Sequence, residues 1–135
     1  EALEIGKASV LREGADASII ACGVMVERAL DAAEALAAKG IDTMVIDMHT
    51  IKPIDREAII RAASRGAIVT AEDHSVMGGL GSAVAEVLVE EAPTMMRMIG
   101  VRDKFGESGS PMDIMDKMGL TSENIASKVV DLLSK

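Results

Sequence analysis

The stretch Ala71–Val84, which reads AEDHSVMGGLGSAV, decides the fold of this chain. It follows a short apolar run at 67–70, and it ends where apolar residues begin to recur at helical spacing. The stretch therefore predicts a strand, a loop and a helix in succession. The loop carries two carboxylates, a histidine and three glycines: Glu72, Asp73, His74, Gly78, Gly79 and Gly81. In an α/β sheet such a loop lies at the carboxyl end of a strand, where ligands usually bind.

This loop has two interpretations that the residues alone leave open. Its glycines allow the backbone to turn tightly and to approach a ligand, and the N-terminus of the following helix offers unpaired N–H groups that favour an anion. Glycine-rich strand-to-helix loops are also common in α/β folds, and the sequence GGLG is a weak signal by itself. The loop is thus either a site of chemistry or a part of the fold's architecture.

Strand and helix patterns alternate along the rest of the chain. Strands are predicted at 7–12, 17–22, 43–48, 67–71 and 95–101, and helices at about 26–37, 55–64, 81–91 and 121–133, with one more helix capped by Ser110. Such alternation indicates a mostly parallel sheet with helices on both faces. The turn at 13–16 is too short for a parallel crossover, so the first strand is expected to be an antiparallel edge strand.

Length and composition limit the classes of function. The 135 residues fit one domain, 49% of them are apolar, and a net charge of −8 argues against a nucleic-acid partner. With Phe105 as its one aromatic residue, the chain lacks the means to stack on single-stranded bases. No apolar run is long enough to span a membrane, and one cysteine, Cys22, suits a reducing compartment. We therefore expect a cytoplasmic protein.

Titratable residues near the expected sheet edge raise the question of catalysis or metal binding. His74 follows two carboxylates, but neighbours in an extended segment point in different directions, so adjacency does not make a catalytic dyad. His49 lies at another strand end, yet the spacing matches no metal-ligand signature. Cys22 ends a buried strand and is expected to be a core residue. We predict no catalytic residue and no metal site, and we expect His74 to act in loop architecture or at a subunit contact.

Several motifs together resemble a known family. They are 14–23 (GADASIIACG), 46–55 (IDMHTIKPID), 69–84 (VTAEDHSVMGGLGSAV), 105–109 (FGESG) and 119–121 (GLT). In this order they are similar to the carboxyl-terminal domain of transketolase-type, thiamine-diphosphate enzymes. The resemblance spans nearly the whole chain and is closest to the split transketolases. Similar domains end 1-deoxyxylulose-5-phosphate synthase and the β subunits of 2-oxo acid dehydrogenases.

The resemblance implies a specific architecture for residues 1–135 as one domain. It is a three-layer α/β/α domain whose five-stranded mixed sheet has the order 1-3-2-4-5, with strand 1 antiparallel. This order places the topological switch point between strands 2 and 4, so Gly23 and the Glu72–Gly79 loop are expected to flank one crevice.

The resemblance also implies a role. In this family thiamine diphosphate and Mg²⁺ bind between a pyrimidine-binding and a diphosphate-binding domain, and the chain has the motifs of neither. It is therefore expected to hold no cofactor and to be inactive alone, as the structural and dimerisation domain of a parent enzyme that transfers ketol groups between sugar phosphates. The expected partners are the two missing domains and a second copy. The alternative is a module that binds a small anionic ligand or docks a partner through the Gly-rich loop 78–81.

Overall fold

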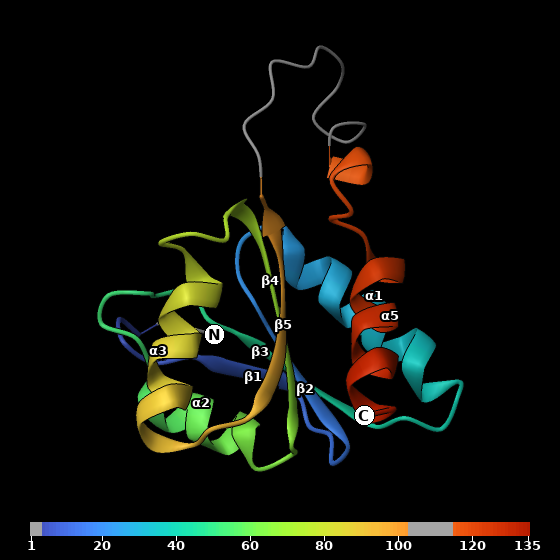
Figure 1. Ribbon diagram of the computed structural model, residues 1–135, viewed down its shortest axis with the longest axis horizontal. Helices are drawn as coiled ribbons and strands as arrows, with labels where there is room; N and C mark the ends of the chain where they lie inside the picture. The colour runs from blue at the N-terminus through green and yellow to red at the C-terminus, as the bar shows by residue number, and fades with distance from the viewer. Residues whose placement is uncertain (1–3, 103–114) are drawn as a thin grey trace.

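Five strands form one mixed sheet in the order β1-β3-β2-β4-β5 (Figure 1). The computed structural model describes residues 4–102 and 115–135, and the strands are β1 (Ser9–Arg12), β2 (Ala17–Ala21), β3 (Thr43–Asp47), β4 (Ala67–Ser75) and β5 (Met95–Val101). Strand β1 runs antiparallel to β3, and the other neighbouring pairs are parallel. The predicted order and the antiparallel first strand are confirmed. The start of the helix expected at Ser110 and the motif at 105–109 lie outside the described residues, and residues 115–117 are helical.

Helices cover both faces of the sheet, as predicted (Figure 1). Helices α1 (Met25–Ala37) and α5 (Ser122–Leu133) pack on one face, and α2 (Arg56–Ala63) and α3 (Leu80–Glu91) pack on the other. Two of them begin at a side-chain cap: Asp55 accepts from the Ala58 N–H, and Thr121 accepts from the Asn124 N–H, both at 3.1 Å. Within residues 4–102 and 115–135, no helix is long and apolar enough to cross a membrane.

Neighbouring residues of the central strands belong to two separate cores. Ile19 and Val69 lie in the core beneath α1 and α5, whereas Ile20 and Ile68 lie in the core beneath α2 and α3. All four side chains are fully buried. A strand with helices on both faces must be apolar at successive positions, which is why these segments read as continuous apolar runs.

Strand β4 is longer than the sequence predicts. We expected a strand that ends at 71 and a loop that carries Glu72, Asp73 and His74; instead β4 runs over Ala67–Ser75. The reason is its partner β5. Pairing between the two strands resumes after an irregularity, with Ser75 opposite Val101. The three polar residues therefore lie in the last part of a strand, and the loop that follows consists of residues 76–79.

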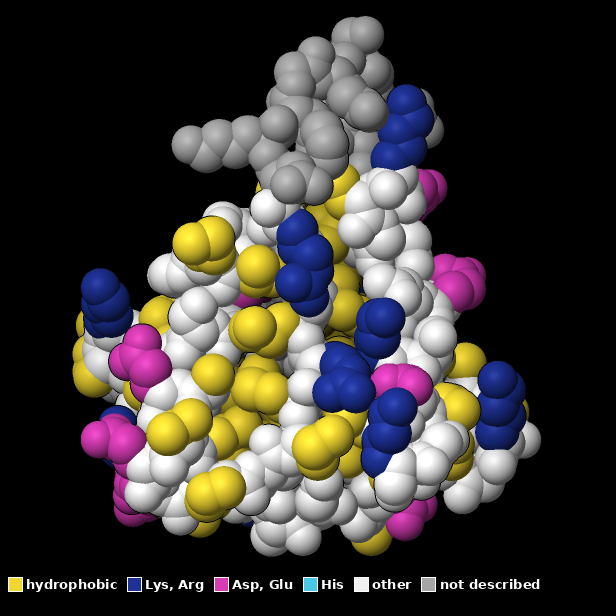
Figure 2. Space-filling model, viewed as in Figure 1, with side chains coloured by type: hydrophobic (Ala, Val, Ile, Leu, Met, Phe, Trp, Pro, Cys, Tyr) yellow, Lys and Arg dark blue, Asp and Glu magenta, His cyan; other side chains and the backbone are white. Residues whose placement is uncertain are grey.

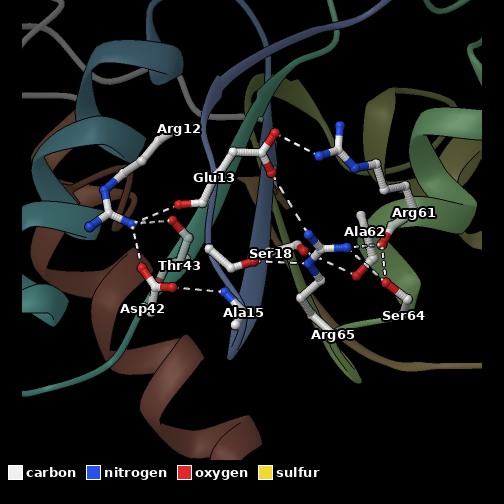
Figure 3. A network of polar contacts seen from close by, with 11 residues as sticks. Arg12, Glu13, Ala15, Ser18, Asp42, Thr43, Arg61, Ala62, Ser64 and Arg65 are labelled. Carbon is white, nitrogen blue, oxygen red and sulfur yellow. Dashed lines mark hydrogen bonds and ion pairs between the residues drawn. The ribbon is translucent and has the colours of Figure 1, made fainter.

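A polar network closes the amino end of the sheet (Figure 3). Arg12 donates to the Thr43 carbonyl oxygen at 2.7 Å and lies 3.2 Å from the Asp42 carboxylate, so the end of β1 is tied to the start of β3. Arg65, just beyond α2, donates to the Gly14 carbonyl oxygen at 2.9 Å. The turn at 13–16 is thus held between β3 and the C-terminal end of α2.

The open edge of strand β5 is partly covered by its own arginines. Figure 2 shows this face: apolar side chains gather around β5 and towards α3, and Lys and Arg side chains gather on the α5 side. Arg97 donates to the Met96 carbonyl oxygen at 3.0 Å, and Arg102 donates to the Met98 carbonyl oxygen at 2.6 Å. Charged side chains on an edge strand disfavour the addition of a further strand.

Candidate functional site

The carboxylate of Glu72 occupies the N-terminus of helix α3. Its two oxygens accept from the Leu80 and Gly81 N–H groups, each at 2.8 Å, and the side chain is fully buried. The first N–H groups of a helix lack partners within the helix, and the helix dipole favours a negative charge there. Two of the donors that an external anion would need are therefore already bound to a carboxylate of the chain itself.

Two glycines provide the space for this carboxylate. A Cβ atom at Gly79 would collide with the Glu72 carboxylate. A Cβ atom at Gly100, on the neighbouring strand β5, would lie 2.7 Å from the Val76 Cγ1 atom and 3.1 Å from the Glu72 Cγ atom. The sequence offers Gly79 as a possible ligand contact. The structure gives another reason for a glycine at this position, which is the close approach of the Glu72 carboxylate to the backbone.

Three side-chain hydrogen bonds fix the loop at 76–79. Ser82 donates to the Val76 carbonyl oxygen at 2.7 Å, and its hydroxyl oxygen accepts from the Gly78 N–H at 3.1 Å. Ser75 accepts from the Met77 N–H at 3.2 Å. Gly78 has a φ of +80°, a conformation that side chains other than glycine rarely adopt. The loop is therefore held by its own residues, while the Met77 side chain remains 82% exposed.

Asp73 and Gly23 meet at the carboxyl edge. A Cβ atom at Gly23, whose φ is +61°, would lie 3.3 Å from the Asp73 Oδ1 atom. That oxygen is buried and accepts no hydrogen bond among the described residues, and the His74 Nδ1 atom lies 3.5 Å away. The His74 side chain is 66% exposed. Strands β2 and β4 thus bring Gly23 and Asp73 together, and His74 lies at the surface beside them.

Cys22 is held as a neutral thiol. The pKa of the thiol is raised to about 11, mainly by burial and then by the carboxylates of Glu72, Asp73 and Asp47. Because the thiolate is the reactive form of cysteine, a thiol with this pKa is a poor nucleophile at neutral pH. Cys22 therefore belongs to the core beneath α2 and α3, as the sequence predicts.

His49 lies apart from this cluster, on the turn after β3. Its Nε2 atom is 3.0 Å from the Glu4 carbonyl oxygen, so the ring contacts the segment that leads into β1. In the described part of the chain, no group of three or more His, Cys, Asp or Glu side chains is arranged to hold a metal ion. The two histidines expected on one sheet edge therefore serve different segments.

A cavity of about 280 Å³ lies between the turn after β3 and the start of α3. Apolar side chains from the turn, Ile51 and Ile54, line one side, and Gly78, Gly79 and Ser82 line the other. Arg56 also reaches the cavity, but its guanidinium is held by Glu91, whose Oε2 accepts from Nε at 2.6 Å. Sequence reasoning missed this cavity and the role of Ser82, because neither the turn nor the serine carries a recognisable motif.

Comparison with known proteins identifies the family. The family model described as "Transketolase, C-terminal domain" matches residues 6–125. The 6-deoxy-6-sulfo-D-fructose transketolase subunit SqwH of Clostridium sp. (strain MSTE9) is 54% identical over 122 residues, which cover 90% of this chain and 38% of that protein. The putative transketolase C-terminal section of Methanocaldococcus jannaschii is 43% identical over 133 residues, covering 98% of this chain and 42% of that protein.

A solved structure shares the fold closely. It is described as "Split gene transketolase, inactive beta4 tetramer", has 50% sequence identity and matches with a TM-score of 0.94. The match covers 98% of this chain and 44% of that chain. This chain thus spans less than half the length of the relatives it matches.

Proposed function

We propose a structural and assembly role for this chain, which belongs to the transketolase C-terminal domain family. In this role residues 1–135 form one domain at the end of one subunit of a split, transketolase-like enzyme. The parent enzyme would transfer ketol groups between sugar phosphates with thiamine diphosphate and Mg²⁺. Its cofactor would lie in the pyrimidine-binding and diphosphate-binding domains, which are the proposed partners together with a second copy in a homodimer.

The observation that carries this proposal is the internal use of the candidate loop. Glu72 binds the start of α3, and Ser75 and Ser82 hold the loop at 76–79. A group that acts in acid–base catalysis must reach the proton of a substrate, whereas Glu72 is fully buried against backbone N–H groups. The same contacts weaken the alternative of a small-anion site at 78–81, since Leu80 and Gly81 already donate to Glu72.

The test of this role uses the Clostridium subunit, of which 122 residues match this chain. One protein lacks the matched part, and a second carries this chain in its place. We expect sedimentation to show that the deletion loses the oligomer and that the chimera recovers it. An equally stable oligomer without the matched part would contradict an assembly role.

A second measurement addresses the cofactor. The isolated 135-residue chain is expected to bind neither thiamine diphosphate nor Mg²⁺ in isothermal titration calorimetry, because it lacks the family's cofactor motifs. Binding in the micromolar range would show that the chain holds a cofactor site of its own.

A further inference from the structure

The two most exposed large apolar residues in the described part of the chain lie at the carboxyl edge of the sheet. Ile5 is 84% exposed, in the segment before β1, and Met77 is 82% exposed, in the loop after β4. Ile5 precedes Gly6, which lies against Pro53 of the turn after β3, and Met77 precedes Gly78, which lines the cavity together with Ile51 and Ile54. We call Ile5, Ile51, Ile54 and Met77 with this cavity the carboxyl-edge patch. Exposed apolar residues grouped on one surface indicate an interaction site.

The segment that carries Ile5 is fixed on this patch. The Glu4 carbonyl oxygen lies 3.0 Å from the His49 Nε2 atom, and a Cβ atom at Gly6 would lie 3.3 Å from the Pro53 Cγ atom. The Ala8 N–H donates to the Asp55 carboxylate at 2.8 Å. In Figure 1 the dark-blue start of the chain accordingly passes beside the green turn that follows β3. Residues 4–8 therefore run along the turn that borders the cavity.

Met77 is presented on a preorganised loop. Ser75 accepts from its N–H, Ser82 fixes the residues on both sides, and Glu72 anchors the helix that follows. Binding costs less free energy when the contacting groups are already ordered. A rigid, exposed Met that precedes Gly78 and Gly79, which line the cavity, has the properties of an interface anchor, since Met fits irregular surfaces well.

The direction of the chain indicates the partner. Because β1 is antiparallel to β3, the chain enters the sheet at the carboxyl edge, where residues 4–8 run beside the patch. The relatives are more than twice as long as their matched parts, and the matching family model is a C-terminal domain. A domain tethered at this point has a high effective concentration at the patch.

We infer that the carboxyl-edge patch docks the domain that precedes this one in the same polypeptide, with Ile5 and Met77 as the anchors. The inference rests on the proposal that the chain ends a longer subunit. The open edge of β5 is less suitable, because arginines cover part of it.

The experiment compares amide hydrogen exchange in the isolated chain and in the chimera with the Clostridium subunit. Docking is expected to slow exchange of the amides at 4–8, 51–56 and 76–79 at least tenfold. The double substitution Ile5→Ser and Met77→Ser should abolish this protection. The control Leu133→Ser removes an exposed apolar side chain on α5, which packs on the other face of the sheet from the cavity, and should leave the protection unchanged. Equal exchange rates in the isolated chain and the chimera would overturn the inference.

A binding measurement gives a second readout that does not depend on the chimera. The 135-residue chain is titrated with the separately purified remainder of the Clostridium subunit. The double variant should bind at least tenfold more weakly than the unmodified chain or Leu133→Ser, and equal affinities would refute the patch. If the chimera is a stable oligomer but shows no protection at the patch, the docking inference fails while the assembly role stands. If the deletion protein keeps the oligomer while the patch is protected, the assembly role fails instead.

Discussion

The two ends of the sheet are built in opposite ways. At the amino end, arginines and carboxylates join the turn at 13–16 to β3 and α2 in a largely exposed polar network (Figure 3). At the carboxyl end, one carboxylate, Glu72, is fully buried, and the apolar side chains of Ile5 and Met77 face solvent. The amino end is thus completed by its own residues, whereas the carboxyl end presents apolar surface on a fixed frame. The difference indicates which end is available to another domain.

Of the substitutions at the two ends of the sheet, removal of the Glu72 carboxylate should lower the stability of the chain most. Glu72→Ala leaves the Leu80 and Gly81 N–H groups buried without an acceptor and opens a cavity beside Gly79. We expect a loss of about 3 kcal/mol in the free energy of unfolding, since hydrogen bonds to charged groups are among the strongest. Urea denaturation measures this free energy. The matched control is Glu72→Gln, which retains one acceptor oxygen and should lose less stability. A cost below about 1 kcal/mol would show that the carboxylate does not hold the carboxyl end together.

The thiol of Cys22 reports on burial at the carboxyl end. Because its pKa is raised to about 11 from the ordinary 9.0, the thiolate fraction at pH 8 falls about a hundredfold. Alkylation by iodoacetamide at pH 8 should be slower in the folded chain than in urea by at least this factor.

The same pKa predicts a pH dependence of stability. The folded state holds the Cys22 proton more tightly than the unfolded state, so stability should fall as the pH rises from about 9 through 11. Cys22→Ser should remove this part of the pH dependence of stability.

In the alkylation experiment, equal rates in the folded and unfolded chain would mean that the thiol is open to solvent.

At the amino end, Gly14→Ala should be the most disruptive single change. A Cβ atom at this position would lie 2.7 Å from the Thr43 Cα atom, and backbone atoms cannot rotate away as a side chain does. We expect a loss of about 2 kcal/mol from overpacking, measured by urea denaturation. Ala15→Ser, in the same turn, serves as the control. Unchanged stability would show that the turn at 13–16 moves freely and that the amino end is not closed by close contact.

Two arginines of the polar network, Arg61 in α2 and Arg65 just beyond it, should contribute differently to stability. Arg65 is 20% exposed at its side chain and donates to the Gly14 carbonyl oxygen, whereas Arg61 is 47% exposed and pairs with Glu13, which is 63% exposed. Arg65→Ala should cost about 1 kcal/mol, the value of a partly buried hydrogen bond, and Arg61→Ala less than about 0.5 kcal/mol. Thermal unfolding in low and high salt distinguishes them, because the exposed Arg61–Glu13 pair should weaken more with salt than the Arg65 hydrogen bond to the Gly14 carbonyl oxygen. A larger loss of stability for Arg61→Ala than for Arg65→Ala would mean that exposed ion pairs hold the amino end of the sheet together.

His74→Ala should have the smallest effect. The side chain is 66% exposed and touches Asp73 at 3.5 Å, so the stability of the isolated chain should change by less than about 0.5 kcal/mol. In the intact parent enzyme we expect weaker dimerisation or a lower melting temperature, and a loss in turnover below about tenfold, well short of the 10²–10⁴ of a general acid–base group. A thousandfold loss in turnover with an unchanged dimer would show that His74 is catalytic.

Local sequence patterns predicted most of the architecture. The helices expected to begin near Asp55 and Thr121 lie where the sequence places them, and so do the buried strands and the antiparallel first strand. These features depend on residues a few positions apart, or on the length of one turn. The end of β4 was predicted wrongly, since its continuation to Ser75 depends on pairing with Val101, twenty-six residues further along the chain.

The amino-acid sequence by itself determined the alternation of strands and helices, the strand order through the family resemblance, and the position of the glycine-rich loop. Only the tertiary structure decided what the loop does. Glu72 lies eight and nine residues before the N–H groups that it binds, and no local pattern shows that α3 turns its N-terminus back onto β4. The exposure of Ile5 and Met77 at the carboxyl edge is likewise a result of folding, because distant segments meet only when the sheet brings their ends together.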